Sequence, residues 1–232
     1  MDTRRLHTIA LAAVLAAVPE GYLAAGEDEA SSSEQRFLVT VTNLTRGQQF
    51  TPLLVATHRE GVRLFRLGSP ASSALAVLAE EGNTAPLTAL LDANPAVFDV
   101  VTVGPLLGPG ASRTVEVRTQ GPFDHVSVAA MLIPTNDGFF AVNGLAGPHG
   151  NRVVVFRSPA YDSGSEVNDE LCASIPGPFF DECGGPGGGG APAGGEEGFV
   201  HIHAGIHGIG DLTAARRDWR NPVALIEVRR QH

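Results

Sequence analysis

The sequence predicts a mainly β fold, an antiparallel β-sandwich with two short helices inserted after the second strand. Two observations favour this fold class. Short segments rich in Val, Phe and Thr recur along the body of the chain, separated by clusters of Gly, Pro, Asn and Ser, as a sandwich of short strands requires. Apolar and polar residues also alternate around Val39 and Val41 and around Val115 and Val117, which indicates strands with one buried and one solvated face.

The expected elements follow one another in a simple order. Two strands, 37–45 and 52–58, precede two helical windows, 69–82 and 84–94. The first window begins at Ser69-Pro70 and ends at Gly82, and Thr84 is a candidate cap for the second, because these residue types start and stop helices. The remaining strands are expected at 97–104, 113–119, 125–134, 151–158, 199–205 and 223–230.

The beginning of the chain is expected to direct export. A basic start is followed by an uninterrupted apolar run from Ile9 to Val18 and then by small residues at Ala24-Ala25, the pattern of a secretory signal peptide. The run is shorter than the about 20 apolar residues of a membrane span. We therefore expect a secreted or periplasmic protein without stable membrane insertion, divided into a signal peptide (1–25), a polar leader (26–36) and one domain (37–230).

Composition and charge disfavour several classes of partner. A chain of 232 residues with 43% hydrophobic content suits one domain with its own core. The net charge is −9, and the 16 basic residues form no extended cluster. Nucleic acids and anionic membranes are therefore not expected as partners, because both require clustered positive charge.

The two cysteines and the glycine-rich segment after them are expected to form one loop region. Cys172 and Cys183 are the only cysteines, and in an exported protein such a close pair is expected to form a local disulfide. Two cysteines without a nearby His are too few to bind zinc. Residues 184–195 have almost no side chains to bury, so they are predicted to be a flexible loop.

Two carboxylates stand just past the ends of two apolar strands. Asn136-Asp137 follows VSVAAMLIP, and Asp162 follows RVVVFRSPAY. Hard cations need several oxygen ligands held at about 2.3–2.6 Å by a scaffold that is rigid without the ion. The arrangement indicates a cation site, and the alternative is that each acid is an ordinary exposed residue at a turn.

The same residues carry a family resemblance. MLIPTNDGFFAVNG followed by SPAYDSGSEVND resembles the paired signature of the spondin amino-terminal domain in its prokaryotic form. The likeness extends from Phe37 to Val228 and includes a closing GIGDL…DWRNPVALIEV. The resemblance implies an antiparallel β-sandwich similar to a C2 domain, decorated with short helices. It also implies Ca²⁺ bound by Glu116, Asp137 and Asp162.

Glu116 interrupts an apolar alternation, so its side chain is expected to face away from the core. If the strand that holds Asp137 neighbours it, the three carboxylates converge at one edge of the sandwich. Together with carbonyl oxygens and water they would supply the oxygen ligands that calcium favours. Candidate secondary ligands follow Asp162 in the chain: Glu166, Asn168 and Asp169.

A second candidate site is the histidine cluster HIHAGIHGIGD, with His201, His203, His207 and Asp211. A His-x-His pair on a strand places both imidazoles on one face, and a third His after a turn could complete a zinc or copper site. The alternative is that His201 and His203 form the solvated face of a strand.

The sequence therefore predicts a calcium-binding, non-enzymatic module for adhesion or for recognition of an extracellular or cell-surface glycan or protein. The alternative function is a secreted metalloenzyme that uses His201, His203 and His207. Nucleophilic catalysis is disfavoured, because the chain has no Gly-x-Ser-x-Gly elbow between a strand and a helix.

Overall fold

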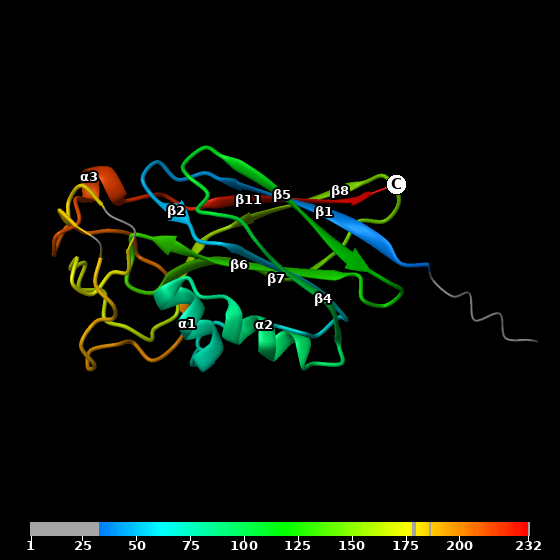
Figure 1. Cartoon of the computed structure of the whole chain (residues 1–232), viewed down its shortest axis with the longest axis horizontal. Helices are drawn as coiled ribbons and strands as arrows, with labels where there is room; N and C mark the ends of the chain where they lie inside the picture. Colours follow the sequence, from blue (N-terminus) through cyan, green and yellow to red (C-terminus); the bar gives the residue numbers. More distant parts are fainter. Residues whose placement is uncertain (1–32, 178–179, 186, 232) are drawn as a thin grey trace, which may run out of the picture. The chain divides into compact units, whose positions relative to one another are not determined.

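The computed structural model describes residues 33–231 except 178–179 and 186. The predicted signal peptide lies outside the described residues. The elements, in chain order, are β1 (Gln35–Asn43), β2 (Gln49–Phe50), β3 (Leu53–His58), α1 (Ser73–Glu81), α2 (Ala85–Asp92), β4 (Val97–Val103), β5 (Ser112–Thr119), β6 (His125–Ile133), β7 (Gly138–Ala146), β8 (Val153–Ser158), β9 (Ala160–Asp162), β10 (His201–Ile202), α3 (Ala214–Arg217) and β11 (Ala224–Gln231) (Figure 1).

The strands form two sheets, which confirms the predicted mainly β fold. One sheet has the order β5-β1-β11-β8, and the other has the order β10-β9-β7-β6-β3-β4 with β2 added beside β6. The pairings between these strands are antiparallel. The main core lies between the sheets, and helices α1 and α2 cover the outer face of the second sheet (Figure 1). None of the described helices is long and apolar enough to cross a membrane.

The two sheets differ in hydrophobic pattern because they differ in how many faces are covered. Strand β1 alternates between buried and partly exposed residues, since only one of its faces meets the core. Strand β6 is buried continuously after its first residue: Val128 and Ala130 face the main core, and Ala129 faces the helices with Leu75 and Leu78. A strand covered on both faces reads as an unbroken apolar run.

Most predicted elements occur within a few residues of their expected bounds, and the exceptions have local causes. Strand β7 was not predicted, because the Asn-Asp-Gly that precedes its apolar stretch indicates a loop. The expected strand at 199–205 pairs only over His201–Ile202. Strand β1 begins at Gln35, inside the predicted polar leader. Helix α1 is capped by Ser72, whose Oγ accepts a bond from the Leu75 amide, whereas Thr84 makes no side-chain cap to α2.

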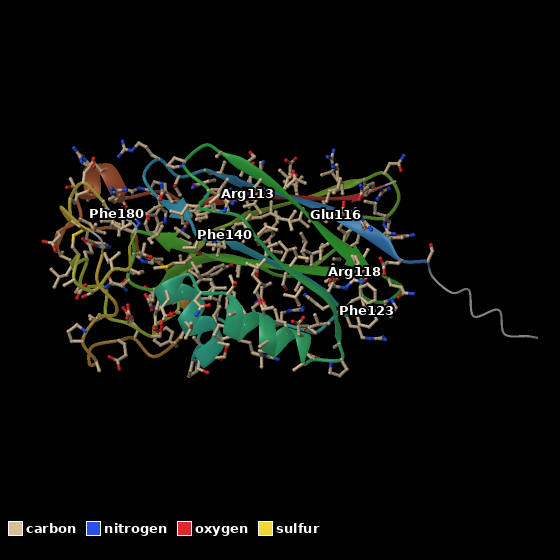
Figure 2. The ribbon with its side chains drawn as sticks, viewed as in Figure 1. Arg113, Glu116, Arg118, Phe123, Phe140 and Phe180 are labelled. Atoms are coloured by element: carbon tan, nitrogen blue, oxygen red, sulfur yellow. A yellow bond between two sulfur atoms is a disulfide. The ribbon has the colours of Figure 1, made fainter. Side chains whose placement is uncertain are left out.

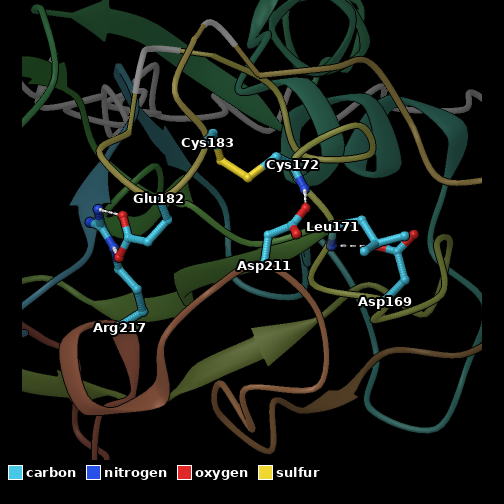
Figure 3. Close-up of a disulfide and its surroundings, with 7 residues drawn as sticks. All are labelled: Asp169, Leu171, Cys172, Glu182, Cys183, Asp211 and Arg217. Carbon is cyan, nitrogen blue, oxygen red and sulfur yellow. Dashed lines mark hydrogen bonds and ion pairs between the residues drawn. A yellow bond between two sulfur atoms is a disulfide. The ribbon is translucent and has the colours of Figure 1, made fainter.

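The predicted disulfide between Cys172 and Cys183 is present (Figure 3). The glycine-rich segment that follows it, predicted to be a flexible loop, approaches the disulfide loop closely at Gly188. The amide of Gly188 donates to the carbonyl of Cys172 at 2.8 Å, and a Cβ on Gly188 would lie 1.6 Å from the Ala173 oxygen. Glycine is required here because the backbone approaches its neighbour too closely for a side chain.

Candidate metal centre

Three neighbouring strands bring the candidate site together at the edge of the second sheet. Asp162, the last residue of β9, pairs with Gly138 of β7 on one side and with His201 of β10 on the other. Asp137 immediately precedes Gly138 in the turn after β6. The register of β7, β9 and β10 therefore places residues from distant parts of the chain beside Asp162.

Asp162 is the centre of this group. Its side chain is fully buried. Its Oδ1 accepts a hydrogen bond from the Gly164 amide at 2.8 Å, and its Oδ2 accepts one from Asn168 Nδ2 at 2.7 Å. Burial raises the pKa of the Asp162 carboxyl, although these donors partly counteract the effect. An ionised carboxylate at this position calls for a compensating positive charge.

His201 presents a ring nitrogen to two carboxylates. Its Nδ1 lies 3.0 Å from the Ile202 carbonyl oxygen, and a carbonyl only accepts, so Nδ1 carries the proton. The lone pair of the neutral ring is then on Nε2, 3.5 Å from Asp162 Oδ1 and 3.9 Å from Glu197 Oε2. Burial lowers the pKa of His201. The Ile202 carbonyl and the carboxylates of Asp162 and Glu197 together raise it by more, so the pKa lies above its ordinary value.

Asn168 contacts the carboxylates of both Asp162 and Glu197 on the side away from His201. Its Nδ2 donates to Asp162 Oδ2 at 2.7 Å and lies 3.4 Å from Glu197 Oε1. This leaves Glu197 Oε2 directed toward His201. Among the described residues, Asp162, Glu197 and His201 form a group whose ligand atoms lie within 4.8 Å of one another.

His203 lies beside this group in a different protonation pattern. It is buried, with Trp219 edge-on to its ring at a centroid distance of 5.0 Å. Its Nδ1 accepts from the Gly205 amide at 3.0 Å, so the neutral ring carries its proton on Nε2, which faces Asp162 Oδ2 at 3.9 Å. Burial lowers the pKa of His203 to about 4. His203 is therefore a neutral donor facing Asp162, not a free lone pair.

Asp137 has one oxygen satisfied and one open. Its Oδ2 accepts from the Ser163 hydroxyl at 2.8 Å and from the amides of Ser165 and Glu166 at 2.9 and 3.2 Å. Its Oδ1 is buried without a hydrogen-bond partner. Burial, followed by the charge of Asp162, raises the pKa of Asp137 to about 6.

Glu116 does not join the other two predicted calcium ligands. It lies on β5, in the opposite sheet, where its exposed side chain pairs with Arg36. Figure 2 shows Glu116 toward the end of the sandwich away from Phe180 and the loops around it. Because β5 neighbours β1 and not β7, the condition for convergence is not met. The three-carboxylate set implied by the resemblance is therefore reduced here to Asp137 and Asp162.

The histidine cluster is only partly brought together. His201 and His203 both face Asp162, while the intervening Ile202 is exposed, so the pair is not the solvated face of a strand. The exposed His207 is held through its backbone amide, which donates to Glu170 Oε1 at 2.6 Å. Asp211 supports the disulfide loop instead, accepting from the Cys172 amide at 2.9 Å (Figure 3).

A small cleft opens beside the centre. Its volume is about 220 Å³, and its lining includes Asp162, Asn168, Glu197 and His201. Sequence reasoning identified Asn168 as a candidate secondary ligand but missed Glu197. Glu197 follows the glycine-rich segment as one of two consecutive glutamates, where no spacing or motif distinguishes it from a solvated acid.

Residues 37–146 match the Spondin_N family. This region belongs to that family. The spondin match spans β1 to β7 and includes Asp137, whereas Asp162, Glu197 and His201 come later in the chain. Spondin-type domains are extracellular and generally non-enzymatic. No curated protein matches the chain.

Proposed function

We propose that this chain is an exported, non-enzymatic recognition module in which a divalent cation fixes the loops around Asp137 and Asp162. Calcium is the ion that the spondin resemblance implies. The proposal includes export by the amino-terminal segment and binding to an extracellular or cell-surface ligand, either a glycan or a protein.

The cation role is supported by two fully buried carboxylates that lie near each other. Asp137 and Asp162 are both 0% exposed, and Oδ1 of Asp137 has no hydrogen-bond partner. Two neighbouring buried carboxylates repel each other unless one is protonated or a cation bridges them. A bound cation would relieve that repulsion and use the open Asp137 oxygen.

A separate cleft supports the recognition role. It has a volume of about 460 Å³ and is lined by residues that include Arg63, Phe65, Arg66 and Tyr161. The rings of Phe65 and Tyr161 lie 4.9 Å apart, while the two arginines are exposed. Aromatic floors with a few polar groups at the rim are typical of ligand sites. In a protein with a net charge of −9, two exposed arginines in one cleft favour a carboxylated ligand, such as an acidic glycan.

Thermal unfolding of the full chain tests the cation role. Free Ca²⁺ at 100 times its dissociation constant should stabilise the folded state by about 2.7 kcal/mol relative to EDTA. Asp137→Asn should abolish that response. In EDTA, the same variant should unfold at a higher temperature than the unsubstituted protein, because the substitution removes the repulsion with Asp162.

Asp92→Asn is the matched control, since Asp92 is an exposed acid at the end of α2. It should leave the ion response unchanged. Unfolding that is insensitive to both EDTA and divalent ions would refute the cation role.

Binding to an array of acidic and neutral glycans tests the recognition role. Acidic glycans should be retained by the unsubstituted protein and lost from a variant with both Arg63→Ala and Arg66→Ala. Arg152→Ala with Arg229→Ala removes two arginines from a different cleft and should leave retention intact. Equal retention by both double variants would exclude the Arg63–Arg66 cleft as the binding site.

A further inference from the structure

We propose that Asp162, Glu197 and His201 bind a first-row transition metal of the zinc class. This inference rests on the proposed cation role, because Asp162 belongs to both, and it names the class of ion.

The lone pair of His201 has a fixed direction. The Ile202 carbonyl holds the proton on Nδ1, so the neutral ring offers Nε2 as a ligand. Nε2 is buried without a hydrogen-bond partner, yet it faces Asp162 Oδ1 and Glu197 Oε2 at 3.5 and 3.9 Å. A lone pair directed at two carboxylate oxygens is unfavourable unless a proton or a metal ion lies between them. A metal ion bound by all three atoms removes this conflict.

Each of the three ligands already has an outer hydrogen-bonding partner. In metal sites, the ring nitrogen of a ligating His that is not bound to the metal usually donates to a carbonyl or carboxylate, and ligating carboxylates are themselves hydrogen-bonded. His201 has the Ile202 carbonyl. Asn168 lies against the remaining oxygens of both Asp162 and Glu197. All three side chains are thus oriented with their inner atoms toward one point.

A residue outside the ligand set also points to an ion. His203 is almost completely buried, with its side chain 3% exposed, and its Nε2 has no hydrogen-bond partner. The Nε2 proton faces Asp162 Oδ2 at 3.9 Å. An unsatisfied buried donor beside the proposed ligand is expected where a solvated ion completes the local hydrogen bonding, because buried polar groups in native proteins nearly always have partners.

The donor set favours a transition metal over calcium. Calcium takes six to eight oxygen ligands, but Glu116 is on the other sheet and one of the three ligands that come together is the imidazole of His201. Imidazole suits Zn²⁺ and related ions, and three protein ligands with an open position form a common zinc arrangement. The cleft of about 220 Å³ next to these residues gives room for water or another ligand in that position.

Calorimetric titration of the full chain, stripped with EDTA and dialysed, tests the inference with ZnCl₂ and CaCl₂ as probes. One Zn²⁺ should bind per chain, more tightly than Ca²⁺. His201→Ala should abolish this binding, and Glu197→Gln should weaken it by at least tenfold. X-ray absorption of the zinc-loaded protein should show one imidazole in the coordination sphere.

His207→Ala is the matched control, because His207 is an exposed histidine that lines the same cleft. It should retain Zn²⁺ binding. Circular dichroism of each variant establishes that it is folded.

The outcomes separate this inference from the proposed function. Ca²⁺ binding that is tighter than Zn²⁺ binding and unchanged in His201→Ala would overturn the transition-metal site and leave the cation role intact. Zn²⁺ binding that His201→Ala and His207→Ala weaken equally would assign it to exposed histidines and also overturn the inference. No binding of either ion would refute both proposals.

Discussion

His201 and Asp162 are register partners across β9 and β10, and this pairing places the imidazole Nε2 3.5 Å from the carboxylate Oδ1. Because alternate residues of a strand face opposite sides, a shift of one residue in this register would send His201 to the other face. The site therefore depends on the pairing of short edge strands as well as on the loops. Residues that position the ligands without contacting the ion are therefore expected to influence metal binding.

Asn168→Ala should weaken Zn²⁺ binding by about 10–100-fold, the usual effect of removing an outer hydrogen-bonding partner. The reason is that Asn168 Nδ2 donates to Asp162 Oδ2 at 2.7 Å and lies 3.4 Å from Glu197 Oε1. Calorimetric titration measures the change. Asn151→Ala, at an exposed position, is the control. If Asn168→Ala binds Zn²⁺ as tightly as the control variant does, Asn168 does not orient the carboxylates.

Gly138→Ala should destabilise the protein by about 1–3 kcal/mol, the typical effect of overpacking. An added Cβ would lie 2.7 Å from Thr135 Oγ1 and 3.0 Å from His203 Cδ2. The substitution should also displace the His203 ring from Asp162. Denaturant unfolding measures the stability. Gly108→Ala is the control, since a Cβ there meets nothing within 4 Å; equal effects of the two substitutions would contradict the tight approach at Gly138.

Much of the fold was predictable because its signals are local. Strands β1 and β5 alternate, and strands β3 and β6 are apolar runs bounded by turn residues, so periodicity identifies them. Strand β7 was not predicted from the sequence, because Gly138 and the preceding Asp137 suggest a loop. Pairing with a strand on each side makes the segment a strand. Tertiary pairing overrides local preference in such cases.

The candidate site was predictable only in part. Asp137, Asp162 and His201 follow or begin strands, which is a signal that sequence carries. Glu116 was assigned by family resemblance, and the strand order β5-β1-β11-β8 separates it from the others. Glu197 joins the site because the chain returns to β9 after the glycine-rich segment, and no short motif encodes that long-range contact.

Stability should fall in acid partly through Glu182. Its carboxylate makes two bonds to Arg217, at 3.0 and 2.7 Å (Figure 3), and the guanidinium lowers the pKa of Glu182 below its ordinary value of 4.5. A depressed folded-state pKa stabilises the protein above the ordinary value, and that contribution is lost as the pH falls from 4.5 through the folded-state pKa.

Glu182→Gln should therefore lower the free energy of unfolding at pH 7 by about 1–3 kcal/mol, because it removes charge-assisted hydrogen bonds. The difference from the unsubstituted protein should shrink below pH 4.5. Thermal unfolding at several pH values measures both effects. Glu60→Gln, at an exposed position, should change neither, and a Glu182→Gln deficit that persists undiminished in acid would argue against the ion pair as its cause.

Replacing Cys172 and Cys183 together by Ser should destabilise the protein by about 2–3 kcal/mol in the chain-entropy model. The loop that the disulfide closes is also held by Asp211, which accepts from the Cys172 amide at 2.9 Å. We therefore expect a lower melting temperature without loss of the folded state. Adding a reductant should lower the melting temperature of the unsubstituted protein to the same value and leave the double variant unchanged. If the double variant were still sensitive to reductant, the effect of the reductant would not come from the Cys172–Cys183 disulfide.

Asn143→Asp should destabilise the protein and weaken binding at the arginine-lined cleft. The Asn143 side chain clamps one wall of this cleft to β7: its Oδ1 accepts from the Leu64 amide at 2.7 Å, and its Nδ2 donates to the Phe65 carbonyl at 2.8 Å. Aspartate keeps the acceptor but loses the donor, and it places a negative charge against the Phe65 carbonyl. Leaving that partly buried carbonyl without its partner costs about 1–3 kcal/mol.

Denaturant unfolding and acidic-glycan binding measure the two effects of Asn143→Asp. Asn83→Asp is the matched control, because Asn83 is exposed and its Oδ1 only accepts, from the Ala85 amide at 3.0 Å; aspartate preserves that bond. If Asn143→Asp were as stable as Asn83→Asp, the donor to Phe65 would contribute nothing. Loss of stability with unchanged glycan binding would instead show that the wall held by Asn143 does not shape the ligand site.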